Sequence, residues 1–245
     1  MVHYIYYKII EVVKGKISFL QLQSRGGFIL KDSYEKNVIP KAIIDRLPLY
    51  FRTLRQLMDE GVKVISSEEL GQRLEITPEQ IRKDLALFGQ FGKKGVGYFI
   101  VELISNIGKI LGLDHKWHIA VIGLGHLGWA LAQYRKFDSL GFELVGLFDV
   151  DPNKIGQCIN GIPVLNLECL QEVMQKQTIH IGIVAVPEQS AQEVADRLVA
   201  TGIRGIWNFA PRKIQVPDTV RIVNHDLSVG LNSLSYHLAR QAESE

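Results

Sequence analysis

The chain has 245 residues, 47% of them hydrophobic, with a mean hydropathy of +0.07 and a formal net charge of +2. These values are typical of a globular protein of one or two domains, not of a fibrous or disordered chain. No apolar run reaches the ~18 residues of a membrane span, so we expect no membrane association. Cys158 and Cys169 belong to no metal-binding or redox motif, which predicts a reduced, cytoplasmic protein without a metal site.

Residues 1–36 form an extension of uncertain structure. The segment begins with apolar residues, but charged residues interrupt it, and it lacks the small-residue cleavage site of a signal peptide. It carries six Lys or Arg and three Asp or Glu. This positive charge at the front of the chain suggests an anionic partner.

The next block, residues 37–115, opens with a long helix. Apolar residues recur at helical spacing from Pro40 to Glu60. Because proline disrupts a helix interior, Pro48 predicts that this helix is entered or bent near Leu47. We expect the helix to stop at Gly61.

Two short helices joined by a tight turn are expected next. Residues 66–69 have the spacing of a capping box and open a helix that runs through Leu74. Thr77 is expected to cap the following helix, with Gln80 as its reciprocal partner, and that helix is expected to run to about Phe88. The three helices together predict a helix-turn-helix arrangement.

A basic, glycine-rich stretch from Gly89 to Tyr98 follows and is expected to form a hairpin wing. A helix-turn-helix with a wing predicts DNA binding, with the second short helix in the major groove and the wing along the phosphate backbone. The alternative is a small helical domain whose charges only keep it soluble. The residues expected to contact DNA are Arg46, Ser66, Gln80, Arg82, Lys83, Lys93, Lys94 and Gly95.

A nucleotide-binding unit is expected between Trp117 and Asp149. A strand, Trp117–Ile122, precedes the sequence Gly-Leu-Gly-His-Leu-Gly at 123–128, and a helix, Leu127–Phe137, and a strand, Glu143–Phe148, follow. In such a unit the first glycine makes a tight turn and the second lets the backbone approach a pyrophosphate. The third glycine lets the helix pack on the strand, and the start of the helix offers N–H groups to the phosphates.

Asp149 lies 21 residues beyond Gly128, near the ~20-residue offset of a carboxylate that binds the ribose hydroxyls. Asp151 adds a second carboxylate, and no arginine directly follows the strand. Because these carboxylates would repel a 2′-phosphate, we expect NAD(H) rather than NADP(H). The alternative is that Asp149 only caps a loop.

Four further elements are expected: a strand at Ile179–Pro187, a helix at Glu188–Thr201, a strand at Gly205–Pro211 and a helix at Val229–Ala239. The carboxyl ends of parallel strands meet at one edge of a sheet, so the residues there can converge on one cofactor. The residues expected to bind it are Gly123, Leu124, Gly125, His126, Leu127, Gly128, Asp149, Val186, Pro187 and Phe209.

From about Ile39 onward the chain resembles the Rex family of bacterial redox-sensing transcriptional repressors. The matching motifs include VISSEELGQRLEITPEQIRKDLALFGQFGKKGVGY, GLGHLGWALAQY, FDVDPNKIG and VNHDLSVGLNSLSYHL. The resemblance implies a homodimer with winged-helix domains that bind operator DNA and Rossmann-like domains that bind NADH or NAD+. It implies that NADH favours release of the DNA, and that Arg82, Lys83 and Lys94 contact the DNA.

The resemblance also implies a relay of three residues, Arg52, Tyr134 and Asp226, between the nicotinamide pocket and the DNA-binding domain. We hypothesise that Asp226 pairs with Arg52 in one state and with Tyr134 in the other. Leu227 stands where some members of the family have phenylalanine, so a contact with the partner's nicotinamide would lack aromatic stacking. The C-terminal helix could fold back on its own sheet, but the resemblance favours its exchange between subunits.

We therefore expect an α/β protein in four parts: an extension (1–36), a winged-helix DNA-binding domain (37–115), a Rossmann-like NAD(H)-binding domain with a parallel sheet (116–225), and a domain-swapped dimerisation helix with a tail (226–245). The expected function is a homodimeric repressor without catalytic residues. The alternative is an NAD-dependent dehydrogenase or a nucleotide-binding subunit similar to acyl-CoA ligases. For a dehydrogenase, His225 would be the candidate base, ahead of His126 and His180.

Overall fold

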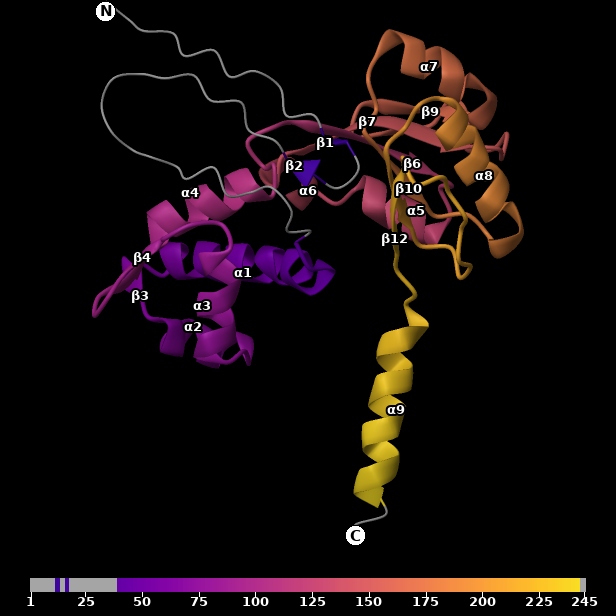
Figure 1. Ribbon diagram of the computed structural model, residues 1–245. Helices are drawn as coiled ribbons and strands as arrows, with labels where there is room; N and C mark the ends of the chain where they lie inside the picture. The colour runs from indigo at the N-terminus through magenta and orange to yellow at the C-terminus, as the bar shows by residue number, and fades with distance from the viewer. Residues whose placement is uncertain (1–11, 14–15, 18–38, 243–245) are drawn as a thin grey trace, which may run out of the picture. The chain divides into compact units, whose positions relative to one another are not determined.

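The computed structural model describes residues 12–13, 16–17 and 39–242 (Figure 1). The chain divides into two compact units, residues 1–112 and 113–245, each of which is described by itself. Most of the extension expected at residues 1–36 lies outside the described residues. Two short strands within it, β1 (Val12–Val13) and β2 (Lys16–Ile17), pair antiparallel.

Over residues 39–112 the first unit combines four helices with a small antiparallel sheet. The helices are α1 (Lys41–Asp59), α2 (Ser67–Leu74), α3 (Pro78–Ala86) and α4 (Ile100–Ile110). The strands, in sheet order, are β3 (Val64–Ile65), β5 (Gly97–Phe99) and β4 (Gly92–Lys93). Helix α1 packs against α4, and α2 packs against α3. This arrangement confirms the predicted helix-turn-helix and its hairpin wing.

Helix α1 differs from its prediction. It begins at Lys41 and continues through Pro48, so the expected entry near Leu47 is wrong. Pro48 is exposed, and water can therefore satisfy the carbonyl of Ile44 that proline leaves without a helical partner. Helix α3 ends at Ala86 rather than near residue 88, and α4 was not predicted.

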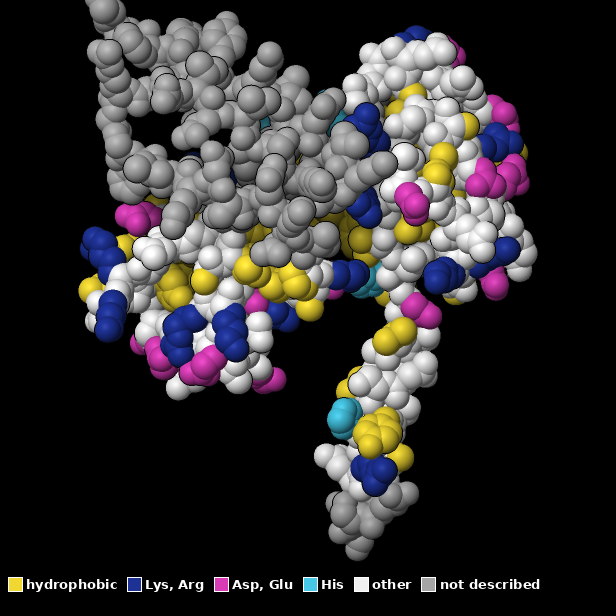
Figure 2. Space-filling view, in the orientation of Figure 1, with side chains coloured by type: hydrophobic (Ala, Val, Ile, Leu, Met, Phe, Trp, Pro, Cys, Tyr) yellow, Lys and Arg dark blue, Asp and Glu magenta, His cyan; other side chains and the backbone are white. Residues whose placement is uncertain are grey.

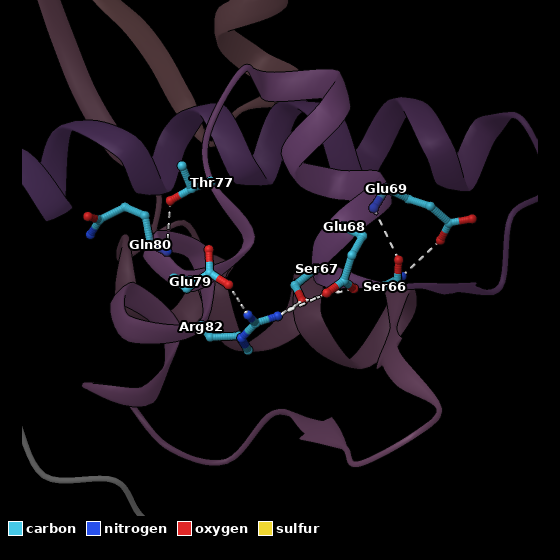
Figure 3. Close-up of polar contacts among 8 residues, drawn as sticks. All are labelled: Ser66, Ser67, Glu68, Glu69, Thr77, Glu79, Gln80 and Arg82. Atoms are coloured by element: carbon cyan, nitrogen blue, oxygen red, sulfur yellow. Dashed lines mark hydrogen bonds and ion pairs between the residues drawn. The ribbon is translucent and has the colours of Figure 1, made fainter.

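The N-terminal caps of α2 and α3 explain where these helices begin. Ser66 Oγ accepts a hydrogen bond from the Glu69 N–H at 3.1 Å, and Glu69 Oε2 accepts one from the Ser66 N–H at 3.0 Å (Figure 3), which confirms the capping box. Thr77 Oγ1 accepts from the Gln80 N–H at 3.3 Å. The prediction that the Gln80 side chain returns to Thr77 is wrong. Instead, Gln80 Nε2 donates to Asp84 Oδ1 at 2.6 Å.

The second unit is built on a seven-stranded sheet of order β12-β11-β10-β6-β7-β9-β8, parallel except for β8. The strands are β6 (Trp117–Ile122), β7 (Phe142–Asp149), β8 (Cys158–Ile159), β9 (Ile162–Asn166), β10 (Ile181–Val184), β11 (Gly205–Asn208) and β12 (Arg221–Asn224). The helices are α5 (His126–Ala132), α6 (Lys136–Ser139), α7 (Leu170–Lys176, after a 3₁₀ turn at Leu167–Cys169), α8 (Glu188–Ala200) and α9 (Ser228–Ala242).

Helices cover both faces of this sheet. Strand β6 alternates between them: Ile119 and Val121 pack with residues of α5 and α6, whereas Ala120 and Ile122 pack with residues of α7 and α8. A strand buried on both faces reads as a continuous apolar run, which is why β6 could be recognised in the sequence.

Several elements of the second unit depart from their predictions. The helix expected from Leu127 to Phe137 is divided into α5 and α6, and the Ala132 carbonyl at the end of α5 accepts a hydrogen bond at 3.1 Å from Asn160, in the turn between β8 and β9. The strand expected at 179–187 is shorter, and the C-terminal helix is longer. Every residue from 223 to 241 is exposed. No helix in the described parts of the chain is long and apolar enough to cross a membrane.

Candidate nucleic-acid interface and nucleotide site

Arg82, expected to contact DNA, lies exposed on α3 and is already paired within the protein (Figure 3). Its Nη1 donates to Ser67 Oγ at 2.6 Å and to Glu68 Oε1 at 3.1 Å, and its Nη2 donates to Glu79 Oε1 at 2.7 Å. A backbone N–H and the Arg82 guanidinium lower the pKa of Glu68. The contact of Arg82 with DNA stays a prediction. Lys83 is exposed next to it.

Arg46 and Gln80, also expected at the DNA, are joined to a carboxylate that sequence reasoning missed. Asp84 is fully buried. Its Oδ2 accepts from Arg46 Nε and Tyr50 Oη, both at 2.6 Å, and its Oδ1 accepts from Arg46 Nη2 at 2.8 Å and Gln80 Nε2 at 2.6 Å. Burial raises the pKa of Asp84, but these hydrogen bonds outweigh it and leave the pKa below its ordinary value. Burial and the Asp84 hydrogen bond raise the pKa of Tyr50.

The wing presents the expected basic residues in a tight turn. Lys93, Lys94 and Gly95 are exposed, and the Val96 N–H donates to the Lys93 carbonyl at 3.0 Å. Lys93 Nζ lies 5.2 Å from the centroid of the Phe99 ring, which holds its ammonium group beside the wing. Figure 2 shows basic side chains gathered over the wing and, mixed with acidic ones, over α2 and α3.

The three glycines of the loop after β6 have different surroundings. A Cβ at Gly123, whose φ is +90°, would lie 2.6 Å from Val186 Cγ1, and one at Gly128 would lie 1.8 Å from the Gly123 carbonyl oxygen. A Cβ at Gly125 would meet nothing within 4 Å. The first and third glycines therefore allow close packing, while the second faces open space, as a backbone that approaches a pyrophosphate must. The residues present fit a dinucleotide.

Asp149 ties this loop to the end of β7. The residue is 7% exposed. Its Oδ2 accepts from the Leu124 N–H at 2.6 Å and from Lys154 Nζ at 3.1 Å, and its Oδ1 accepts from the N–H groups of Val150 and Asp151 at 2.8 and 2.9 Å. Burial raises the pKa of Asp149, but these bonds more than offset it and lower the pKa overall. Asp149 thus caps the loop, its ribose contact stays a prediction, and Lys154 is a neighbour that the prediction missed.

The glycine loop lies where the order of the strands reverses. From β6 the chain passes to β7 and β9 on one side and then returns to β10 on the other, and ligands bind at such a switch point in open parallel sheets. Val186 touches the loop, and Pro187 and His126 are exposed beside these strand ends. Phe209 follows β11, with its ring centroid 4.5 Å from that of Trp207.

The three relay residues are divided between the two units, Arg52 in the first and Tyr134 and Asp226 in the second. Arg52 is exposed on α1 in the first unit. Tyr134, in the second unit, is 48% exposed, and its ring centroid lies 5.0 Å from that of Phe137. Asp226 Oδ1 accepts from the Ser228 hydroxyl and N–H at 2.7 and 2.8 Å, and these bonds lower the pKa of Asp226. Asp226 therefore caps the start of α9, and its pairing with Arg52 or Tyr134 stays a hypothesis.

The candidate catalytic histidines have no common site. His180 Nδ1 accepts from the His118 N–H at 2.9 Å at the beginning of β6 and β10, the opposite end of these strands from the glycine loop. Burial, and then the charge of His118, lower the pKa of His180. His225 is exposed and lies beside the paired rings of Trp207 and Phe209, with centroid distances of 6.1 and 5.5 Å.

Known proteins resemble this chain over nearly all of its described length. Residues 38–86 match the family described as "Putative DNA-binding protein N-terminus", and residues 114–212 match the family described as "CoA binding domain". The "Redox-sensing transcriptional repressor Rex" of Roseiflexus sp. (strain RS-1) is 48% identical over 205 residues, 84% of this chain and 93% of that protein. The protein of the same description from Syntrophobacter fumaroxidans is 46% identical over 82% of this chain and 96% of its own length.

Solved structures agree with these relatives. The crystal structure of RSP in complex with β-NAD+ and operator DNA matches with a TM-score of 0.80 and 43% identity, covering 84% of this chain and 95% of RSP. The structure of RSP with β-NADH matches with a TM-score of 0.78 and 42% identity, covering 84% of this chain and 97% of RSP. RSP is described as a Rex-family repressor.

Proposed function

The chain belongs to the Rex family of redox-sensing transcriptional repressors, and we propose that it binds operator DNA through residues 37–115 and releases that DNA when NADH binds residues 116–225. NAD+ competes with NADH for the same site. The observation that carries this proposal is that one chain contains both a winged helix-turn-helix and a dinucleotide-binding loop. Both lie within the 84% of the chain that matches the Roseiflexus repressor at 48% identity.

The decisive experiment measures the affinity of the full chain for its best DNA fragment, selected from genomic DNA, with and without saturating NADH. The salt concentration must be fixed, because phosphate contacts make the affinity depend steeply on it. A coupling free energy of ~1–3 kcal/mol predicts affinities that differ roughly 5- to 150-fold. Equal affinity in the two conditions would refute the proposal.

Helix α9 supports a dimer. Leu227, Val229, Leu231, Leu234 and Leu238 are each 59–69% exposed. A helix of about 15 residues is only marginally stable alone in water, so its order requires a partner surface. We propose that a second copy of the chain supplies that surface by exchanging helices, and that the dimer sets the spacing between the two reading helices. Removal of residues 227–245 should convert the dimer to a monomer in light-scattering measurements.

The relay hypothesis has a sharp test because Asp226 also caps α9. Asp226→Asn keeps an equally good cap but removes the charge that pairs with Arg52. We expect this variant to bind NADH and DNA, with a DNA affinity that no longer responds to NADH. Ser228→Ala is the matched control, because it weakens the cap and keeps the carboxylate. If Asp226→Asn responds to NADH as the parent does, the switch role is wrong.

NAD(H) is the proposed cofactor rather than NADP(H). Asp149 and Asp151 together carry two negative charges, and Lys154, 3.1 and 3.7 Å from them, compensates one. The remaining charge disfavours a 2′-phosphate. Titrations of NADH and NADPH, followed by cofactor fluorescence, should show weaker NADPH binding, and equal affinities would contradict this choice.

The dehydrogenase and acyl-CoA-ligase alternatives are not favoured, because the relatives that span the whole described chain are named transcriptional repressors. His225, the candidate base, lies beside the rings of Trp207 and Phe209. We expect no oxidation of NADH in a panel of carbonyl substrates, and turnover that His225→Ala abolished would revive the alternative. We also propose that the protein works in the cytoplasm, where a repressor meets its operator.

A further inference from the structure

Asp84 is a fully buried carboxylate between α1 and α3, and every side chain bonded to it is a donor. Arg46 and Tyr50, which is itself fully buried, fix it from α1. Gln80 meets it from the preceding turn of α3. The site therefore suits an anion. An asparagine at position 84 would have the same shape, but its NH2 group would face the N–H and O–H donors of the surrounding side chains.

We propose that Asp84 is a positioning residue that sets the base specificity of α3 by fixing the orientation of the Gln80 amide. This inference rests on the proposed DNA-binding role of α3. Gln80 Nε2 donates to Asp84 Oδ1 at 2.6 Å, so the amide oxygen faces away from Asp84. The nitrogen has a second hydrogen that Asp84 does not use. Gln80 thus presents an acceptor beside a donor, the pair that matches N6 and N7 of adenine in the major groove.

The place of Gln80 in the fold suits this role. It lies in the first turn of α3, and the first residues of a reading helix are the ones that reach base edges. Figure 3 shows its side chain extending away from the network around Arg82. Without Asp84, the amide of Gln80 would be free to turn over and point its donor nitrogen at the acceptors of guanine. Asp84 excludes that orientation.

The first test uses the unaltered full chain and DNA with modified bases. In the duplex selected from genomic DNA, each adenine is replaced in turn by purine, which lacks the N6 amino group, or by 7-deazaadenine, which lacks N7. At one adenine of each half-site, both analogues should weaken binding roughly 5- to 150-fold. In Gln80→Ala the same analogues should have no effect at that adenine.

Two results of this test have different meanings. If the chain binds DNA and responds to NADH, but no adenine shows a penalty that depends on Gln80, the inference is overturned and the proposed function stands. If the chain binds no fragment selectively or ignores NADH, the proposed function itself fails.

The second test isolates Asp84. Asp84→Asn should lose the preference for adenine over guanine at the position read by Gln80 and keep its preferences elsewhere. Tyr50→Phe is the matched control, because Tyr50 bonds to Oδ2 and leaves the Oδ1 bond to Gln80 in place. If Asp84→Asn does not fold, the triple variant Arg46→Met, Tyr50→Phe, Asp84→Leu replaces the ion pair by apolar groups, which buried sites often tolerate.

At the position read by Gln80 the triple variant should lose the preference for adenine over guanine, while the loss of Arg46, itself expected at the DNA, lowers the affinity for all duplexes alike. Unchanged helix content of the full chain in circular dichroism verifies that the first unit of each variant is intact. A uniform fall in affinity for all duplexes, with the adenine preference retained, would assign Asp84 a purely structural role and overturn the inference.

Discussion

Alanine substitutions at Gly128 and Gly125 should separate the packing of the nucleotide loop from its contact with the cofactor. A Cβ at Gly128 would lie 1.8 Å from the Gly123 carbonyl oxygen and 2.9 Å from its carbon. Because these are backbone atoms, α5 must move away from the loop by more than an ångström. A Cβ at Gly125 meets nothing within 4 Å, and its φ of −67° suits alanine.

The two opposing effects at Gly128 can be compared. Alanine gains about 1 kcal/mol in helix propensity, whereas overpacking against backbone costs about 3 kcal/mol, the upper end of the usual range. We expect Gly128→Ala to lose about 2 kcal/mol, a fall of roughly 8 °C in the melting temperature of a unit of this size. Gly125→Ala should melt within about 2 °C of the parent, since it disturbs no packing.

Tryptophan fluorescence reports this melting selectively, because Trp117, Trp129 and Trp207, the three tryptophans of the chain, all lie in residues 113–245. We expect both variants to bind NADH more weakly, Gly125→Ala without loss of stability. If Gly125→Ala binds NADH as the parent does, the backbone does not approach the pyrophosphate there. If Gly128→Ala melts as the parent does, the close packing of α5 is not required.

Three further outcomes are expected. The double variant Glu68→Gln, Glu79→Gln should release Arg82 from its ion pairs. Fluorescence anisotropy should then show tighter DNA binding with a steeper dependence on salt concentration. Unchanged affinity would show that these ion pairs do not restrain Arg82. Burial, followed by a neighbouring imidazole, lowers the pKa of His180, so its contribution to stability is full above pH ~6.5 and falls as the unfolded state takes up a proton below that pH. His180→Gln should flatten the decline in melting temperature between about pH 7 and pH 5, and an unchanged slope would contradict this. Leu234→Asp places a charge on the exposed apolar face of α9, so light scattering should show a monomer. A dimer that persists in this variant would contradict the proposed exchange of α9 between two copies of the chain.

The parts of the fold that the sequence predicted well are specified by neighbouring residues. The capping box at 66–69 and the N-cap at Thr77 position α2 and α3 through contacts three residues apart. Strand β6 has the predicted bounds because burial on both faces leaves it no polar position except at its start.

The elements that were missed or misjudged depend on contacts between distant residues. At the break between α5 and α6, the Ala132 carbonyl is bound by Asn160, which lies 28 positions further along the chain. Strand β12 is short and largely exposed, and its pairing with β11 leaves no apolar alternation to recognise. Helix α4 was different, because Ile100, Leu103 and Ile107 follow helical spacing, and that signal was available in the sequence.

Contacts between residues distant in the sequence also explain what was missed in the candidate sites. Arg46 and Asp84 are 38 residues apart, and only the fold shows that Asp84 is fully buried while its partner Arg46 stays 24% exposed. Asp149 was expected to face a ribose, but its hydrogen bonds show that it also closes the loop through Leu124. Residue type and spacing identified both positions, whereas the partners that orient them required the fold.

The turn of the wing has a practical consequence. Lys93 and Lys94 are adjacent, exposed and placed at the tip of a hairpin with short strands, and exposed tips of this kind are preferred points of proteolytic nicking. Trypsin should therefore cut the free protein after Lys93 and Lys94, and bound DNA should shield both bonds. Occupancy of the operator can then be followed by the survival of these two peptide bonds, with no label on either molecule.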